Sequence, residues 1–262
     1  MRRCFQRIDR LEPRRFLDAT LANGVLLVEG TGLSDDIVVY FYRADPGAEA
    51  FYNVEIGPVN GERPTRLWQF PAAEVKSVVV RAGAGDDVVD LSAPYAPGNI
   101  LTEVGPVAVP ARVDGGLGSD TITGGTARDF LYGSFGNDQI NGGPGDDWID
   151  GGWGNDVLHG NAGNDFVYGA AGNDVVGGDE GNDRLFGGSG DDFLGSLGFG
   201  PRPTEPGNDI LVGGAGENRL VGGEGKDSLF GGTGRDHFSR ADDESEMLDR
   251  TPDEPIDIVL PV

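Results

Sequence analysis

The chain has 262 residues, of which 44 are acidic and 20 are basic, so its formal net charge at pH 7 is −24. A surface this acidic repels phosphate groups, which excludes nucleic acid as a partner. The single cysteine, Cys4, cannot form an internal disulfide, and the longest apolar run, residues 37–42, is far shorter than the roughly 20 residues of a transmembrane helix.

Residues 1–20 are predicted to form a basic N-terminal arm that lacks the apolar core of a secretory signal peptide. Within the arm, residues 11–17 (LEPRRFL) resemble the LEPR-type N-terminal motif of exported bacterial proteins. This resemblance implies a targeting segment. The alternative is a short solvated arm with no targeting role.

Residues 21–112 are predicted to form a β-rich region. Five runs in it are rich in β-branched and aromatic residues and are separated by turn residues, namely 25–29, 36–43, 51–57, 65–70 and 75–81. Residues 30–39 look like a degenerate copy of the repeat that follows, and 82–90 (AGAGDDVVD) like a further copy. We expect this region to cap the open edge of a repetitive coil and to continue it.

Residues 115–195 repeat one nine-residue unit nine times without a gap. Glycine occupies position 1 of every unit and position 4 of all but one, aspartate occupies position 6, and an aliphatic residue occupies position 8. Glycine permits a tight turn over positions 1–6 whose carbonyls can converge, and the aspartate adds a carboxylate beside them. Positions 7–9 then form a short strand with position 8 pointing inward.

One such unit cannot bury a core alone. Two consecutive units make one turn of a flattened coil, so units n and n+2 stack and pair in parallel. A hard cation such as calcium prefers six to eight oxygen ligands, and it would lie between the turns of stacked units. The alternative, a disordered glycine-rich tract, does not explain an aliphatic residue every nine positions, although it describes the chain better without calcium.

The repeat resembles the RTX (repeats-in-toxin), or hemolysin-type, nonapeptide family over residues 115–239. That resemblance implies an all-β fold, a parallel β-roll, whose calcium ligands are turn carbonyls and the position-6 aspartates. Two departures predict a distorted turn and a weaker site: Ala127 replaces a position-4 glycine, and Asn218 replaces an aspartate. The implied metal ligands are Asp120, Asp129, Asp138, Asp147, Asp156, Asp165, Asp174, Asp183, Asp192, Asp209, Asp227 and Asp236.

The negative charge is concentrated in the repeats. Residues 115–195 contain 14 acidic and 2 basic side chains, whereas residues 1–81 contain 11 of each. Repeats without metal should therefore repel themselves, and calcium binding should drive their folding.

The predicted organisation has four parts: an arm at 1–20, a β-rich region at 21–112, a calcium-binding roll at 113–239 with a proline-rich loop at 196–206, and an acidic tail at 240–262. The tail either caps the roll or serves as an export signal. The RTX resemblance also implies an extracellular bacterial protein, secreted or on the cell surface.

No catalytic motif is evident in the sequence. It lacks HExxH, a GxSxG with a histidine partner and a phosphate-binding loop, and both histidines fall at outward repeat positions. We therefore favour a non-enzymatic calcium-binding module with a structural or interaction role. The alternatives are an extracellular hydrolase with a site in residues 21–112 and a glycan-binding adhesin.

Counting the unit at Gly115 as the first, the even-numbered units place aromatic side chains outward, and the odd-numbered units mostly place small or polar ones there. Exposed aromatic stripes mark contact surfaces for a protein or a glycan. The alternative is that the N-terminal region, the loop or the tail covers the stripe. Its members are Phe130, Tyr132, Trp148, Phe166, Tyr168 and Phe186.

Overall fold

The computed structural model describes residues 18–44, 47–58, 66–92, 103–195, 207–239, 246–247 and 258–260. The arm at 1–17, including the LEPR-type motif, the loop at 196–206 and most of the tail lie outside the described residues. Within the described part, β-strands dominate, with one 3-10 turn, η1 (Ala72–Glu74). No helix in that part is long and apolar enough to span a bilayer.

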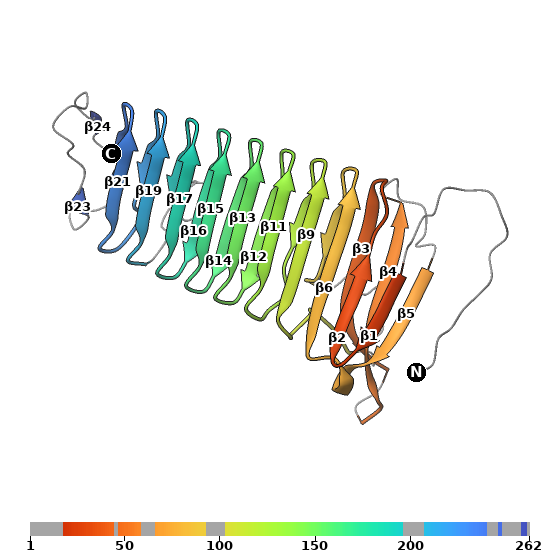
Figure 1. Cartoon of the computed structure of the whole chain (residues 1–262). Helices are drawn as coiled ribbons and strands as arrows, with labels where there is room; N and C mark the ends of the chain where they lie inside the picture. Colours follow the sequence, from red (N-terminus) through yellow and green to blue (C-terminus); the bar gives the residue numbers. More distant parts are fainter. Residues whose placement is uncertain are drawn as a thin grey trace.

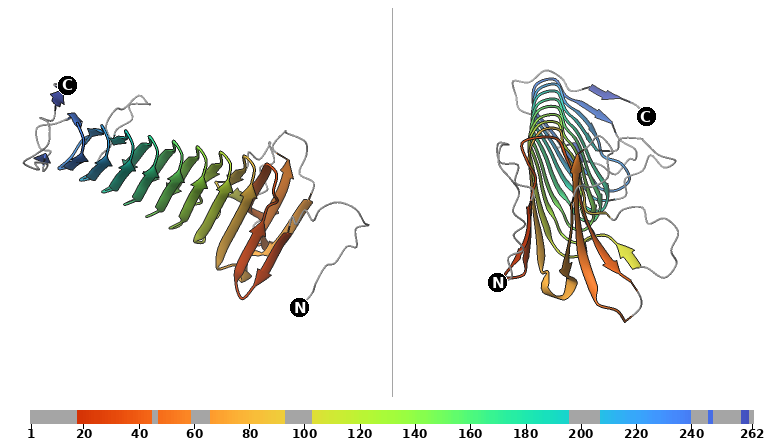
Figure 2. Two further views of the ribbon diagram at one scale, coloured as in Figure 1. Left: turned by 45° about the horizontal axis from the view of Figure 1, so that its top comes forward. Right: turned by 90° about the vertical axis from the view of Figure 1, so that its right-hand side faces the viewer.

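The strands form two sheets that face each other across a flattened coil, as the end-on view in Figure 2 shows. Sheet A contains, in spatial order, β1 (Asp18–Ala22), β2 (Val25–Glu29), β6 (Ser77–Ala84), β9 (Ala111–Leu117), β11 (Phe130–Phe135), β13 (Trp148–Trp153), β15 (Phe166–Ala171), β17 (Arg184–Ser189), β19 (Ile210–Ala215), β21 (Ser228–Thr233) and β23 (Glu246–Met247).

Sheet B is the second layer of the coil. It contains β24 (Ile258–Leu260), β22 (His237–Ser239), β20 (Arg219–Val221), β18 (Phe193–Gly195), β16 (Val175–Glu180), β14 (Val157–Ala162), β12 (Gln139–Pro144), β10 (Thr121–Thr123), β7 (Val88–Asp90), β3 (Asp35–Arg43), β4 (Ala50–Pro58) and β5 (Arg66–Pro71), with β8 (Glu103–Gly105) paired to β3.

From β9 onward the strands alternate between the sheets, and the coil advances along one axis (Figure 1). Units n and n+2 pair in parallel and in register, so Leu131 lies opposite Ile149, which lies opposite Val167. The parallel β-roll expected from the repeat is therefore confirmed.

The strands are longer, and the turns shorter, than the sequence pattern suggested. β13 comprises positions 7–9 of one unit and positions 1–3 of the next, and its pairing with β15 continues through Trp153 and Ala171. The predicted six-residue turn is wrong in extent because alternation continues through the glycines, and only positions 4–6 form the turn. Positions 8 and 1 both point inward, which buries Ile149 and Gly151.

The core is a double column of aliphatic side chains along the axis of the coil. Every position-8 residue of the nine units is at most 1% exposed, and the same column continues through Leu220, Leu229 and Phe238. It also extends backward into the N-terminal region, where Val80 of β6 and Val89 of β7 are fully buried. One hydrophobic core thus runs through both regions.

The N-terminal end of the stack differs from the repeats in strand direction. β1 pairs antiparallel with β2, and β4 and β5 add to β3 as antiparallel strands. These strands occupy the N-terminal end of the roll in Figure 1, where a parallel coil would otherwise leave strand edges open.

Replacing Leu158 with Ala tests the core column. Leu158 is fully buried at position 8 in the middle of the roll. The resulting cavity should lower the free energy of unfolding by about 2–5 kcal/mol, measured by urea unfolding in saturating calcium. Val157→Ala is the matched control, because Val157 points outward and is 36% exposed; its effect should stay within about 1 kcal/mol. Equal losses would contradict the inward orientation of position 8.

Candidate metal centre

The glycines of the unit serve two different physical purposes. At position 4, Gly154 has a φ of 130°, and a Cβ there would overlap the carbonyl oxygen of Gly136 in the turn below. Position 2 also has positive φ, as in Gly152 at 101°. Four non-glycine residues adopt this strained left-handed conformation at position 2: Ser134, Asn161, Ala170 and Asp179.

Position 1 requires glycine for space rather than for backbone conformation. A Cβ on Gly142 would lie 2.7 Å from Asp147 Oδ2 and 2.6 Å from the carbonyl oxygen of Gly160. The expected conformational reason for glycine at position 1 is therefore wrong. The aspartate of the same unit and a carbonyl of the stacked unit occupy the volume that a side chain would fill.

The position-6 aspartates form a continuous inner ladder along each edge of the coil. The backbone N–H of Asp138 donates to Asp156 Oδ1 at 2.8 Å, and the N–H of Asp156 donates to Asp174 Oδ1 at 2.9 Å. The sequence insertion does not break the ladder, because the N–H of Asp183 donates to Asp209 Oδ1 at 2.8 Å across 26 residues. Each carboxylate thus accepts a backbone hydrogen bond from the turn one coil earlier.

All twelve predicted ligand residues lie in these two ladders and are at most 3% exposed. Asn218 takes the place of an aspartate, with its Oδ1 accepting the N–H of Asp192 at 3.0 Å. One edge carries Asp120, Asp138, Asp156, Asp174, Asp192 and Asp236, and the other carries Asp129, Asp147, Asp165, Asp183, Asp209 and Asp227.

The second carboxylate oxygen is the unusual feature of the inner ladder. In eight of these aspartates Oδ2 is buried and has no hydrogen-bond partner: Asp120, Asp138, Asp147, Asp156, Asp165, Asp174, Asp183 and Asp192. A buried acceptor without a donor costs about 1–3 kcal/mol, and more when it is charged. Such a row of unsatisfied oxygens indicates that a cation belongs beside them.

The oxygens around each turn fit a hard cation. Near Gly142, Oδ2 of Asp147 and the carbonyl oxygen of Gly160 face the same small space. Within the described residues, no three His, Cys, Asp or Glu side chains converge on one point. The oxygens that the structure does bring together are those of carboxylates and backbone carbonyls, a ligand type that suits calcium rather than a softer metal.

Burial without a counter-charge raises the pKa of these carboxyls. Desolvation, helped by the neighbouring charges of Asp183 and Asp147 and opposed by a backbone hydrogen bond, raises the pKa of Asp165 to about 7. The same desolvation raises the pKa of Asp156 and of Asp174 to about 6. Protons and a metal ion therefore compete for the same oxygens.

Position 5 forms an outer ladder that runs in the opposite direction. The N–H of Asn155 donates to Asn137 Oδ1 at 2.7 Å, and the N–H of Asn173 donates to Asn155 Oδ1 at 2.8 Å. On the other edge, the N–H of Asn182 donates to Asn164 Oδ1 at 3.2 Å. The sequence pattern gave position 5 no such role, although the recurring Asn-Asp pairs were a signal that could have indicated it.

The inner ladder extends beyond the predicted ligands, to Asp87 and Asp35. Asp87 is 1% exposed; its N–H donates to Asp120 Oδ1 at 2.8 Å, and its Oδ1 accepts the N–H of Asp35 at 2.6 Å. The repeat-like stretches at 82–90 and 30–39 were the signals for these two residues.

At the N-terminal end of each ladder, N–H or O–H groups of the protein donate hydrogen bonds to Oδ2 of the last carboxylate. Oδ2 of Asp35 accepts the N–H of Thr31 at 2.6 Å and its hydroxyl at 2.7 Å. On the other edge, Asp129 accepts the N–H of Ala111 at Oδ1 and the N–H of Gly125 at Oδ2, both at 2.7 Å. These two carboxylates thus differ from those with an unsatisfied oxygen.

The six predicted aromatic residues lie on sheet A and are partly exposed, and several of their rings pack against one another. Trp148 and Phe166 stack with ring centroids 4.1 Å apart and an interplanar angle of 9°, and Phe166 contacts Phe186 at 4.9 Å. One face of the Trp148 ring is therefore occupied by Phe166.

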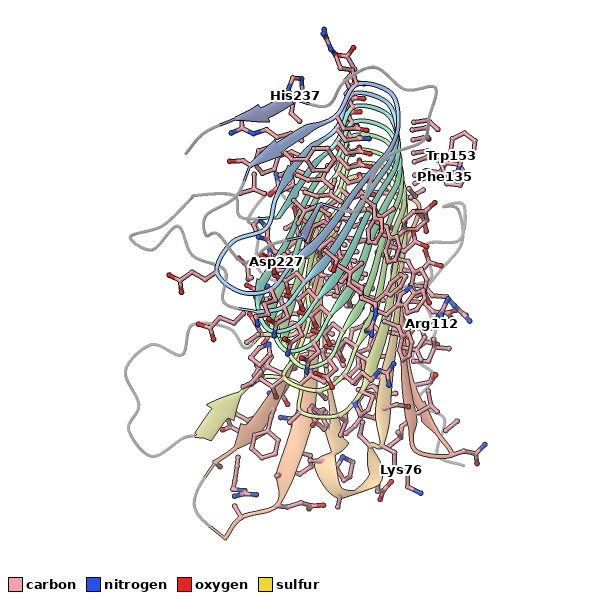
Figure 3. All side chains as sticks on the ribbon, turned by 90° about the vertical axis from the view of Figure 1, so that its left-hand side faces the viewer. Lys76, Arg112, Phe135, Trp153, Asp227 and His237 are labelled. Atoms are coloured by element: carbon pink, nitrogen blue, oxygen red, sulfur yellow. The ribbon has the colours of Figure 1, made fainter. Side chains whose placement is uncertain are left out.

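A second apolar row, at position 3 of sheet A, is more exposed than the first. Leu117, Phe135 and Trp153 are 55%, 51% and 67% exposed, and the Phe135 and Trp153 rings project side by side from the coil (Figure 3). This row was not predicted, because position 3 had been assigned to the turn.

The family model of the RTX calcium-binding nonapeptide repeat (4 copies) matches residues 114–149, 132–167, 150–185, 159–194 and 204–238. No curated protein matches the chain. The matched stretches are therefore RTX repeats, and they bind calcium, which confirms the family and the metal expected from the sequence. Residues 1–113, with Asp35 and Asp87, lie outside the match.

Asn155 provides a test of the outer ladder. Asn155→Leu removes the acceptor for the N–H of Asn173 and should lower stability by about 1 kcal/mol. The calcium concentration at the folding midpoint, followed by circular dichroism, should rise accordingly. Asn155→Asp keeps an acceptor oxygen, as Asp191 does at the same position, and should shift the midpoint less. Equal shifts would show that the outer ladder does not support the turn.

The raised pKa values predict how stability without calcium depends on pH. The folded pKa values of about 6 to 7 exceed the unfolded value of about 3.9. Their stabilising contribution is therefore complete below about pH 4 and disappears as the pH rises through 6 to 7. In chelator, the roll should be more stable to urea at pH 5 than at pH 8. In saturating calcium the trend should reverse, because protons displace the metal; a chelated roll that is most stable at pH 8 would refute this.

Proposed function

We propose that this RTX repeat protein is an extracellular calcium-dependent module with a structural or interaction role. In this proposal each calcium lies between the turns of units n and n+2 and holds the coil together without taking part in catalysis. The observation that carries the proposal is the row of buried Oδ2 atoms that lack a hydrogen-bond donor. A divalent cation satisfies these oxygens and neutralises their charge.

The proposed ligands are the twelve position-6 aspartates together with turn carbonyls. They should not be equivalent. Asp129 already has protein donors at both carboxylate oxygens, and Asn218 offers a neutral oxygen. We expect weaker binding at these two turns than at Asp147 or Asp156, whose Oδ2 atoms lack donors.

Calcium binding and folding should be one process in this chain. The repeats at 115–195 carry 14 acidic and 2 basic residues, and their carboxylates are packed on top of one another. Without a cation, the ladder concentrates negative charge at low dielectric, so binding energy becomes folding energy. Extracellular calcium modules bind at about 10⁻⁴–10⁻³ M. A site in that range stays empty in the cytosol and fills after export, so the roll would fold outside the cell.

The proposed organisation assigns residues 21–112 to the cap and residues 113–239 to the roll. The antiparallel strands β1, β4 and β5 at the N-terminal end support this division. Residues 1–20 and 240–262 would then serve targeting, or, in the case of the tail, capping at the other end. The loop at 196–206 is a tolerated insertion, since the ladders continue across it.

Contact with another molecule through sheet A is a second candidate function. The exposed row of Leu117, Phe135 and Trp153 favours an apolar partner surface. Glycan binding by stacking on Trp148 is less favoured, because Phe166 covers one face of that ring. A hydrolase site in residues 21–112 has no supporting cluster among the described residues there.

Far-UV circular dichroism during a calcium titration from chelator tests the proposal. A cooperative gain of β signal near millimolar calcium, absent with magnesium, is expected. Asp156→Asn should raise the midpoint by removing the charge beside an unsatisfied oxygen. Asp150→Asn is the control, because it removes one carboxylate charge from a side chain on the outward face of β13. Full β content in chelator at neutral pH would refute calcium-dependent folding.

A further inference from the structure

Residues 82–87 correspond to positions 1–6 of a unit, with the turn itself at 85–87, and they have the backbone geometry of an RTX repeat although they lie outside the matched residues. Gly83 and Gly85 have φ of 117° and 116°, close to 107° and 125° in Gly116 and Gly118 of the first repeat. A Cβ on Gly118 would overlap the carbonyl oxygen of Gly85. The two turns are therefore stacked in direct contact, as the turns within the repeats are.

Both ladders join residues 82–87 to the first repeat. The N–H of Asp87 donates to Asp120 Oδ1 at 2.8 Å, which continues the inner ladder. The N–H of Ser119 donates to Asp86 Oδ1 at 2.8 Å, which continues the outer ladder. The inner-ladder partners here are 33 residues apart in sequence, whereas stacked repeats are usually separated by 18.

Asp87 has the same unsatisfied oxygen as the repeat aspartates. It is 1% exposed, and its Oδ2 is buried without a hydrogen-bond partner. Asp35, one step further along the ladder, has its Oδ2 bonded to Thr31 instead. The row of unsatisfied oxygens on this edge therefore begins at Asp87 and not at Asp35.

The charges around Asp87 also favour a cation. The carboxylates of Asp120, Asp35 and Asp86 lie close enough to repel the buried carboxylate of Asp87, and a cation would offset this repulsion. One feature departs from the repeat: Ala82 occupies position 1, where the repeats have glycine. By the geometry at Gly142, its methyl group leaves less room beside the Asp87 carboxylate than the repeat glycine does.

We propose that residues 82–87 and 115–120 form a further calcium site, with Asp87 and Asp120 as its carboxylate ligands. This proposal rests on the proposed function, because the site copies the arrangement between stacked repeats. The ion would join two turns that are distant in sequence and would fasten the N-terminal β-region to the roll. Packing of that region would then depend on calcium even though residues 1–81 carry no net charge. The methyl group of Ala82 makes this site weaker than those within the repeats.

The test uses the full chain and counts bound calcium by native mass spectrometry. Asp87→Asn keeps an acceptor for the N–H of Asp35 but loses the charge, and it should bind one calcium fewer than wild type. Asp35→Asn is the matched control at the end of the same ladder, where Oδ2 already accepts hydrogen bonds from Thr31. It should bind as many calcium ions as wild type. Hydrogen exchange should show calcium-dependent protection of β7 that Asp87→Asn loses and Asp35→Asn keeps.

The outcomes separate this proposal from the proposed function. A wild-type chain that binds no calcium would overturn both. Calcium binding by the repeats together with an unchanged count in Asp87→Asn would overturn the further site alone. If Asp87→Asn does not fold, Ala82→Gly tests the same site by restoring the repeat residue. It should lower the calcium concentration that protects β7, and an unchanged midpoint would overturn the site.

Discussion

The structure depends on a buried carboxylate oxygen for which the protein supplies no hydrogen-bond donor. Most units commit one oxygen of the position-6 aspartate to the turn one coil earlier and leave the other without a donor, as at Asp147, whose Oδ2 lies near the carbonyl oxygen of Gly160. Such an arrangement is unfavourable in the protein alone, because like partial charges meet at low dielectric. A cation would make it favourable, and this supports the proposal that the roll folds on binding calcium.

The glycine pattern follows from the same arrangement. At position 1 the side chain is absent because the carboxylate and a carbonyl of the next coil fill its place. At position 4 the backbone has positive φ and contacts the turn below, so both conformation and space exclude other residues. Position 2 has positive φ, and a Cβ on Gly152 would overlap the carbonyl oxygen of Ser134. Ser134 and Asn161 nevertheless occupy this position, with φ of 80° and 74° and a cost in strain. Three glycines that look alike in the sequence are thus required for different physical reasons.

Much of the fold could be predicted from the sequence because nine-residue periodicity determines which units stack. Position 8 as the core follows directly from it, and the buried Ile149 confirms this. The hydrogen bonds that link the stacked position-6 aspartates, such as that from the N–H of Asp129 to Asp147 Oδ1, were not predicted. The length of the strands could not be predicted, because glycines at positions 1 and 2 look like turn residues until the pairing of the next coil is known. Asp87 was not among the predicted ligands because its stacking partner lies 33 residues away, so the nine-residue period gives no hint of the contact.

Register in this coil is therefore set by hydrogen bonds between stacked turns and not by distance along the chain. The inner ladder links Asp183 to Asp209 across 26 residues with the same geometry that links Asp165 to Asp183 across 18. The outer ladder makes the same step between Asn182 and Asn208. Each ladder bonds a turn to both of its neighbours. Because the two ladders run in opposite directions, each turn both donates to and accepts from each neighbour, and an ion between two turns would constrain both. The insertion at 196–206 leaves these bonds intact even though β18 ends at Gly195 and pairs with β16 only at Phe193 and Leu194. The hydrogen bonds between turns, rather than full strand pairing, therefore preserve the register across an insertion.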